Sequence, residues 1–69
     1  MGIVEYRNIS EREQMNILWD DSVFQFDYFG DDGCTHEIYT LNGFLVELIL
    51  DLRNDEILNK KIMEINSFC

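Results

Sequence analysis

The chain contains no proline and only five basic residues among its 69 residues. Without proline, the turns must be marked by glycine, asparagine and aspartate. The basic residues are scattered along the chain, at Arg7, Arg12, Arg53, Lys60 and Lys61. Because nucleic-acid binders neutralise phosphates with lysine and arginine, and anionic membranes attract the same residues, we expect direct binding to neither.

Cysteines and long apolar runs are also scarce. The two cysteines, Cys34 and Cys69, do not make a disulfide framework. The longest apolar stretch, residues 44–52, is interrupted by Glu47 and Asp51, which makes it too polar to span a membrane. The first residues show no signal-peptide pattern. We therefore expect a cytoplasmic protein, with a reducing cytosol of bacterial type as the default.

Negative charge is what the chain has in excess. Fourteen Asp and Glu residues stand against the five basic ones, which gives a formal net charge of −9. This charge fits a basic protein partner, and it fits equally well a simple role in solubility. The length leaves room for a single small domain, residues 1–69.

The N-terminal part predicts one short helix. Residues 3–9 form a lead-in that contributes at most a few strand residues. Ser10 starts the helix, because with the glutamate three residues later it forms a capping box. Met15, Leu18 and Trp19 then share one helix face, and we expect this face, with Trp19 mostly buried, to pack on a sheet.

From residue 23 the apolar residues recur at every second position, which predicts strands. We expect strands from residue 23 to a turn at 30–33, over 34–41, and from 44 to about 52. The aromatic residues of the first strand, Phe24, Phe26 and Tyr28, are expected in the core. The tail fits a helix or a strand over residues 55–68, and we favour a strand over 61–68. The expected fold is α+β, with one short N-terminal helix packed on an antiparallel β-meander of three to four strands.

Asn42-Gly43 predicts a two-residue hairpin turn, which fixes the register of the flanking strands. One sheet face then carries Tyr39, Val46, Leu48 and Leu50, and we expect the helix to cover it. The opposite face carries Ile38, Leu45 and Ile49. Such an apolar patch is typical of contact with a partner or a second copy, although the chain tail could equally cover it.

The same register brings Cys34, His36, Glu47 and Asp51 together on the opposite face. Thiolate, imidazole and carboxylate are zinc ligands, so these four residues are the candidates for a metal site. Cys34 with His36 as its base is a second, thiol-based interpretation. Because no further ligand or catalytic motif accompanies them, a solvated polar face is the competing interpretation. We expect no metal, no cofactor and no enzymatic activity.

Acidic residues around the predicted turn at 30–33 are the candidate contact residues. Asp31 and Asp32 lie at its tip, and Asp27 and Glu37 flank it. The hypothesis is a non-enzymatic, acidic protein-interaction module, in concrete form an inhibitor or immunity-type protein that binds a basic partner, with mimicry of nucleic acid as one version. A homodimer through a sheet face or edge is an alternative assembly. The alternative function is a small metal-binding or thiol-reactive protein that uses Cys34 and His36.

Two segments carry a resemblance. Leu18-Trp19, followed by Ile38-Tyr39-Thr40-Leu41-Asn42-Gly43-Phe44-Leu45-Val46-Glu47, resembles small uncharacterised bacterial proteins of about this length. Those proteins show a Leu-Trp at a helix end and a Leu/Ile-Tyr…Phe-x-Val-Glu hairpin. The resemblance implies a bacterial helix-plus-meander domain and no known activity.

Overall fold

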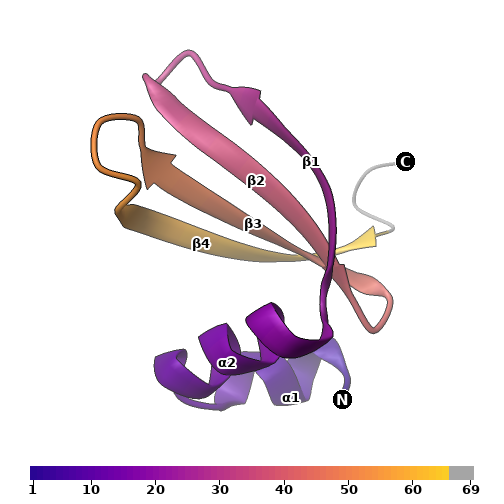
Figure 1. Ribbon diagram of the computed structural model, residues 1–69. Coiled ribbons are helices and arrows are strands. Elements are labelled where there is room, and N and C mark those ends of the chain that lie inside the picture. Colours follow the sequence, from indigo (N-terminus) through magenta and orange to yellow (C-terminus); the bar gives the residue numbers. More distant parts are fainter. Residues whose placement is uncertain (66–69) are drawn as a thin grey trace.

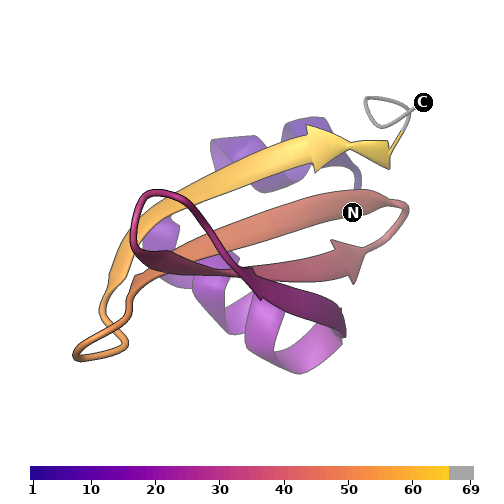
Figure 2. The same ribbon diagram turned by 90° about the horizontal axis from the view of Figure 1, so that it is seen from above.

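The computed structural model describes residues 1–65, which form two helices and four strands (Figure 1). The elements are α1 (Ile3–Asn8), α2 (Glu11–Asp21), β1 (Val23–Phe29), β2 (Cys34–Leu41), β3 (Phe44–Asp51) and β4 (Ile57–Glu64). The strands pair antiparallel in the order β1-β2-β3-β4. Both helices lie on one face of the sheet (Figures 1 and 2), so the predicted α+β meander is confirmed.

The β2–β3 hairpin has the register that Asn42-Gly43 predicts. Leu41 pairs with Phe44 across the turn, and the pairing continues without a shift to Cys34 and Asp51. Asn42 and Gly43 both have positive φ, 50° and 87°, which a turn of this kind requires. Since side chains alternate between the two faces of a strand, this register decides which residues of β2 and β3 face the helices.

The core lies between the helices and the sheet. Its buried members are Tyr6, Leu18, Leu41, Phe44, Val46 and Leu48. Met15 packs against this core as predicted, but the prediction for Trp19 is wrong, because Trp19 is 56 % exposed. Helix α2 turns Gln14 and Leu18 toward the sheet instead. Trp19 lies at the margin, where its ring meets that of Tyr39 edge-on at a centroid distance of 6.0 Å.

The segment before Ser10 is a helix, α1, and the expected lead-in with strand residues is wrong. Tyr6 explains the difference: its side chain is fully buried and its ring lies 5.3 Å from that of Phe44. Its hydroxyl donates to the Gln14 carbonyl at 2.6 Å, and the Gln14 side-chain amide donates to the Tyr6 carbonyl at 2.7 Å. These reciprocal bonds hold the two short helices together. The Ser10 cap is confirmed, since its hydroxyl accepts from the Glu13 amide at 3.2 Å.

Strand β1 contains a bulge that divides its aromatic residues between the two sheet faces. Phe24 pairs with Tyr39 on the helix-covered face, but the register shifts before Phe26, which pairs with Ile38 on the opposite face. A bulge places two residues of one strand opposite one residue of its partner. The expectation of a shared core face for Phe24, Phe26 and Tyr28 is therefore wrong, and all three are exposed.

The ambiguous tail forms strand β4, so the favoured strand is confirmed, although it begins at Ile57 and not at residue 61. Its predicted end at residue 68 lies outside the described residues. Lys60 is held beneath helix α2, because its ammonium donates to Glu11 Oε1 at 3.1 Å and also to the Gln14 side chain. Neither helix within residues 1–65 has the length and apolar character needed to cross a membrane.

Candidate functional site

The only histidine, His36, lies between two carboxylates on the sheet face opposite the helices. Its Nδ1 is 2.6 Å from Glu47 Oε2, and its Nε2 is 3.1 Å from Asp32 Oδ2. The Tyr28 ring stacks on the imidazole with a centroid distance of 4.7 Å and an angle of 12°. The Tyr28 hydroxyl also donates to Glu47 Oε2 at 3.4 Å. We call Tyr28, Asp32, His36 and Glu47 the histidine cluster.

The two carboxylates determine the charge of His36. The hydrogen bond to Glu47 raises the pKa of His36 above its usual range, and Asp32 adds to this although burial opposes it. In turn, the hydrogen bond from His36 lowers the pKa of Asp32, with help from the Cys34 amide. Each shift favours the charged form of its group, and in the protonated imidazole both N–H groups would donate to carboxylates. Through these contacts the cluster connects strands β1, β2 and β3 with the β1–β2 turn.

Gly30 allows this arrangement, because a β-carbon at position 30 would lie 2.6 Å from His36 Nε2 and 2.7 Å from Asp32 Oδ1. We expect Gly30→Ala to push these two side chains apart and so lower the pKa of His36 toward that of free imidazole. Because the chain has a single histidine, its ring proton resonances can be followed directly in an NMR pH titration.

Gly33→Ala, in the same turn, is the matched control for Gly30→Ala. Gly33 has a positive φ of 78°, but nothing lies within 4 Å of a β-carbon there. This variant should cost on the order of 1 kcal/mol through backbone strain and leave the His36 titration unchanged. An unchanged titration in Gly30→Ala would contradict the role given to Gly30.

The other candidate metal or thiol residues contact different groups. Cys34 and Asp51 are cross-strand neighbours, as predicted. The Cys34 thiol lies 3.9 Å from the Asp32 carbonyl, and Asp51 Oδ1 accepts from the Arg53 amide at 2.8 Å. Burial and the nearby carboxylates raise the pKa of the Cys34 thiol, which disfavours the reactive thiolate. No group of three or more His, Cys, Asp or Glu side chains within residues 1–65 is arranged to hold a metal ion. The metal and thiol interpretations gain no support.

The four candidate contact residues separate into two pairs. Asp31 and Asp27 are exposed, the first in the β1–β2 turn and the second on β1. Asp32 also lies in this turn, but its carboxylate contacts His36 in the histidine cluster and so does not project freely from the tip. Glu37 faces the helices and accepts from the Tyr39 hydroxyl at 2.8 Å. Burial and this bond raise the pKa of Tyr39 to about 12.

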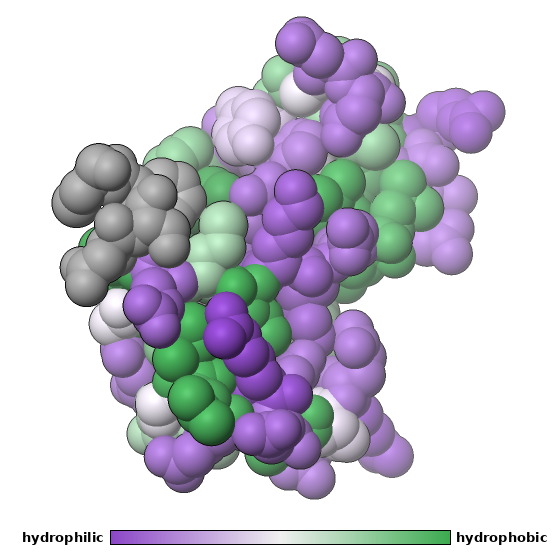
Figure 3. All heavy atoms as spheres, turned by 180° about the vertical axis from the view of Figure 1, so that it is seen from behind, coloured by the Kyte–Doolittle hydropathy of each residue, from purple (hydrophilic) through white to green (hydrophobic). Residues whose placement is uncertain are grey.

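Acidic side chains gather at one end of the sheet without forming a single stripe. Cys34 pairs with Asp51, so the β1–β2 and β3–β4 turns lie at the same end. Hydrophilic side chains dominate this upper end of the molecule in Figure 3. Other acidic residues lie on both helices and on β4, at Glu5, Glu11, Glu13, Asp20, Asp21 and Glu64. This spread gives no support to mimicry of a nucleic-acid strand.

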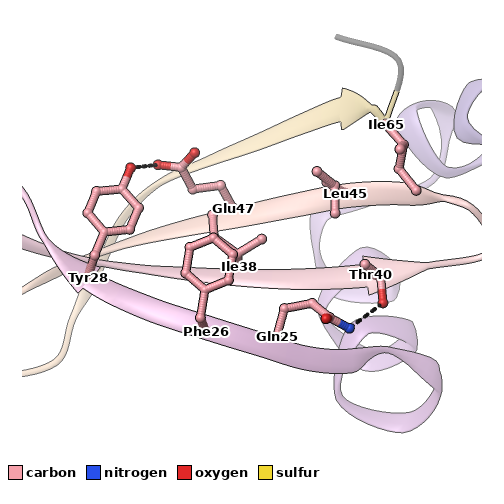
Figure 4. A pocket seen from close by; sticks show the side chains of 8 residues that line it. All are labelled: Gln25, Phe26, Tyr28, Ile38, Thr40, Leu45, Glu47 and Ile65. Atoms are coloured by element: carbon pink, nitrogen blue, oxygen red, sulfur yellow. Dashed lines mark hydrogen bonds between the residues drawn. The ribbon is translucent and has the colours of Figure 1, made fainter. Parts of the chain in front are cut away.

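A groove lies beside the histidine cluster on the same sheet face (Figure 4). It encloses about 350 Å³. The groove is lined by Gln25, Phe26, Tyr28, Ile38, Thr40, Leu45, Glu47 and Ile65. Most of this lining is apolar, and Glu47 belongs both to the groove and to the histidine cluster. The predicted apolar patch around Ile38 and Leu45 is therefore the floor of a groove.

Sequence analysis missed Asp32 as a partner of His36 and Tyr28 as its stacking neighbour. Asp32 lies four residues before His36 on the other side of a glycine turn, where strand register does not apply. Tyr28 reaches His36 because the bulge in β1 brings the two residues into register. The sequence did contain one indication. An aspartate often accepts a hydrogen bond from the backbone amide two residues later, and Asp32 Oδ1 accepts from the Cys34 amide at 3.0 Å.

Comparison with known proteins adds no assignment to this geometry. The chain matches no model of a protein family, no curated protein and no solved structure. The resemblance to small bacterial proteins stays a prediction, and any function must be argued from the residues themselves.

Proposed function

We propose that this chain is a non-enzymatic protein-interaction module that binds a basic partner along strand β1. The observation that supports this function best is the exposure of the whole strand: all seven residues of β1 are exposed. Five of them carry large apolar side chains, Val23, Phe24, Phe26, Tyr28 and Phe29. On the face opposite the helices, Phe26 and Tyr28 adjoin with ring centroids 6.4 Å apart, and exposed apolar surface of this kind often marks a contact site.

The position of β1 in the sheet adds a second argument. As an edge strand it presents backbone groups that have no neighbouring strand within residues 1–65. Natural edge strands are protected by lysine, proline, a bulge or a covering segment, and of these β1 has only the bulge between Phe24 and Phe26. The other edge, β4, carries Lys60 and Lys61, and the Arg7 side chain donates to the Ile62 carbonyl at 3.1 Å. Strand addition from a partner is therefore favoured at β1.

The charges around β1 favour a basic partner over a second copy. Asp20 and Asp21 precede the strand, Asp27 lies within it, and Asp31 and Asp32 follow it. A basic strand would meet opposite charges along this edge, and the net charge of −9 would accelerate the encounter. A second copy would bring like charges together. An inhibitor or immunity-type role, in which this chain occupies a basic surface of its target, is the concrete form of the proposal.

Val23→Lys tests the edge directly. A lysine at this 60 % exposed position should block strand addition and leave the fold intact. Val4→Lys is the matched control, because Val4 is 66 % exposed but lies on α1. We expect affinity capture from a cell lysate to recover a basic protein with the wild type and Val4→Lys. Recovery with Val23→Lys should fall at least about tenfold, which corresponds to a loss of about 1.4 kcal/mol in binding free energy.

Asp31→Asn and light scattering complete the experiment. Asp31→Asn should slow association with the captured partner at low salt. The difference in association rate between this variant and the wild type should shrink above about 0.1 M salt, where charges more than about 10 Å apart are largely screened. Equal recovery by Val23→Lys and the wild type would contradict the β1 interface. A dimer seen by light scattering and lost in Val23→Lys would replace the basic partner with a second copy.

A further inference from the structure

The groove opposite the helices has the size and composition of a small-molecule site. Its volume of about 350 Å³ lies within the range of known ligand pockets, about 300–1,000 Å³. Phe26 and Tyr28 form one wall, with ring centroids 6.4 Å apart. Ile38 and Leu45, which come from the two central strands, form the floor (Figure 4). An apolar body in the groove would contact aromatic and aliphatic surface together.

Glu47 supplies a polar group within this apolar surface. The residue is only 8 % exposed, and its carboxylate has two oxygens with different surroundings. Oε2 is bound to both His36 and Tyr28, whereas Oε1 has no hydrogen-bond partner within residues 1–65. No fully buried side-chain oxygen or nitrogen in that part of the chain lacks a partner. Oε1 is therefore accessible to solvent, and because Glu47 lines the groove, a ligand in the groove can donate a hydrogen bond to this oxygen.

The histidine cluster leaves this oxygen with uncompensated charge. Even with His36 protonated, the two carboxylates of Asp32 and Glu47 leave the cluster with one excess negative charge. Lys61 is the cross-strand neighbour of Glu47 on β4, but the two side chains form no ion pair within 4 Å. At the other end of the groove, the Gln25 side-chain amide donates to the Thr40 hydroxyl at 3.1 Å, so these two polar groups partly satisfy each other. Among the polar groups of the groove, the Glu47 carboxylate therefore has the strongest remaining capacity to bind a ligand, and its negative charge favours a cation.

We propose that the groove binds a small organic cation, a primary ammonium group on an apolar, preferably aromatic, body. The ammonium donates to Glu47 Oε1, and the body lies between Phe26, Ile38 and Leu45. The faces of Phe26 and Tyr28 add a cation–π attraction. A carboxylate on the same body is repelled by the net negative charge, and a neutral alcohol loses the charge-assisted hydrogen bond.

The test is an NMR titration of the full chain at about 0.15 M salt, where exposed charges are screened within about 8 Å. The probes are 4-phenylbutylamine, 4-phenylbutan-1-ol and 4-phenylbutanoate, which share one apolar body. We expect the amine to bind at least about tenfold more tightly than the alcohol, which is the gain of a net charge-assisted hydrogen bond. The carboxylate should not bind, and the shifted resonances should belong to Phe26, Ile38, Leu45 and Glu47.

Two variants separate the groove from the rest of the surface. Leu45→Lys places a competing ammonium in the groove and should abolish binding of the amine. Leu52→Lys makes the same change on an exposed residue of the β3–β4 turn and should leave binding intact. Glu47→Gln should remove the preference for amine over alcohol, provided that NMR shows the sheet to be intact.

Several results would overturn the proposal. Equal affinity for amine and alcohol would reduce the groove to an apolar surface, and amine-induced shifts confined to Asp31 and Asp55 would show only general attraction between charges. The absence of any shift would remove the site. Partner recovery with Val23→Lys tests the β1 interface separately, and this variant should bind the amine like the wild type because Val23 does not line the groove.

Discussion

Leu18→Ala should lower the free energy of unfolding by about 2–5 kcal/mol, the usual range for a large aliphatic residue removed from a core. Leu18 is fully buried between α2 and the sheet, among Tyr6, Val46 and Leu48. A chain of 69 residues has a total stability of about 3–10 kcal/mol at typical values per residue. The variant should therefore be largely unfolded or melt far below the wild type. Thermal unfolding followed by circular dichroism measures the change.

The neighbouring Trp19→Ala is the control for this result. Trp19 is larger than Leu18, but its exposed ring makes one edge-on contact with Tyr39, so its loss should cost only about 0.5–1.5 kcal/mol. Leu18→Met keeps the volume and should cost less than about 1.5 kcal/mol, which separates packing from a general intolerance of change. If Trp19→Ala were the more damaging of the two alanine variants, the orientation given for α2 would be wrong.

The second large effect concerns the histidine cluster. The wild type should lose stability as the pH rises from 6 to 9. The reason is that Glu47 and Asp32 raise the pKa of His36 in the folded state above its unfolded value of about 6.5. The stabilisation is thus fully present below about pH 6.5 and is lost as the pH passes through the higher, folded pKa. Melting temperatures measured across this range in one buffer series would show the decline.

Single and double substitutions show whether the ion pair causes this decline. His36→Phe keeps an aromatic ring against Tyr28 but leaves Glu47 buried beside no cation, which should cost about 3 kcal/mol at pH 6. Adding Glu47→Leu removes both charges and should restore most of the loss, because an apolar pair of similar shape is often nearly neutral. The double variant should also melt at the same temperature at pH 6 and pH 8, a range that lies below the titration of the Cys34 thiol. A decline with pH in the double variant would place its cause outside the cluster.

The sequence predicts the centre of the sheet better than its surroundings. Asn42-Gly43 demands positive φ at two successive residues, so one dipeptide determines the pairing of β2 and β3 over their full length. It also places Glu47 close to His36. Such local chemistry leaves few alternatives, and this is why the prediction succeeds there.

The failures arise where tertiary contacts override local patterns. Helix α1 is too short to be stable alone and exists because Tyr6 is buried against Phe44 and bonded to Gln14. The rotation of α2 depends on the same contact, so Trp19 could not be placed without it. The bulge in β1 changes which face Phe26 occupies, although the alternation of residues along the strand is unbroken. Neither the groove nor the stacking of Tyr28 on His36 could be located before that shift was known.

The bulge in β1 also has a consequence for the colloidal behaviour of the protein. Phe24 lies on one face and Phe26 on the other, and no strand within residues 1–65 pairs with the outer backbone edge between them. Covering one face therefore still leaves an exposed aromatic ring on the other. At neutral pH the charge of −9 keeps molecules apart. Near the isoelectric point, about pH 4.1, that repulsion vanishes while the edge stays open. If β1 binds a basic chain as proposed, the acidic excess would serve two ends: it would attract that chain to the strand and repel identical copies from it.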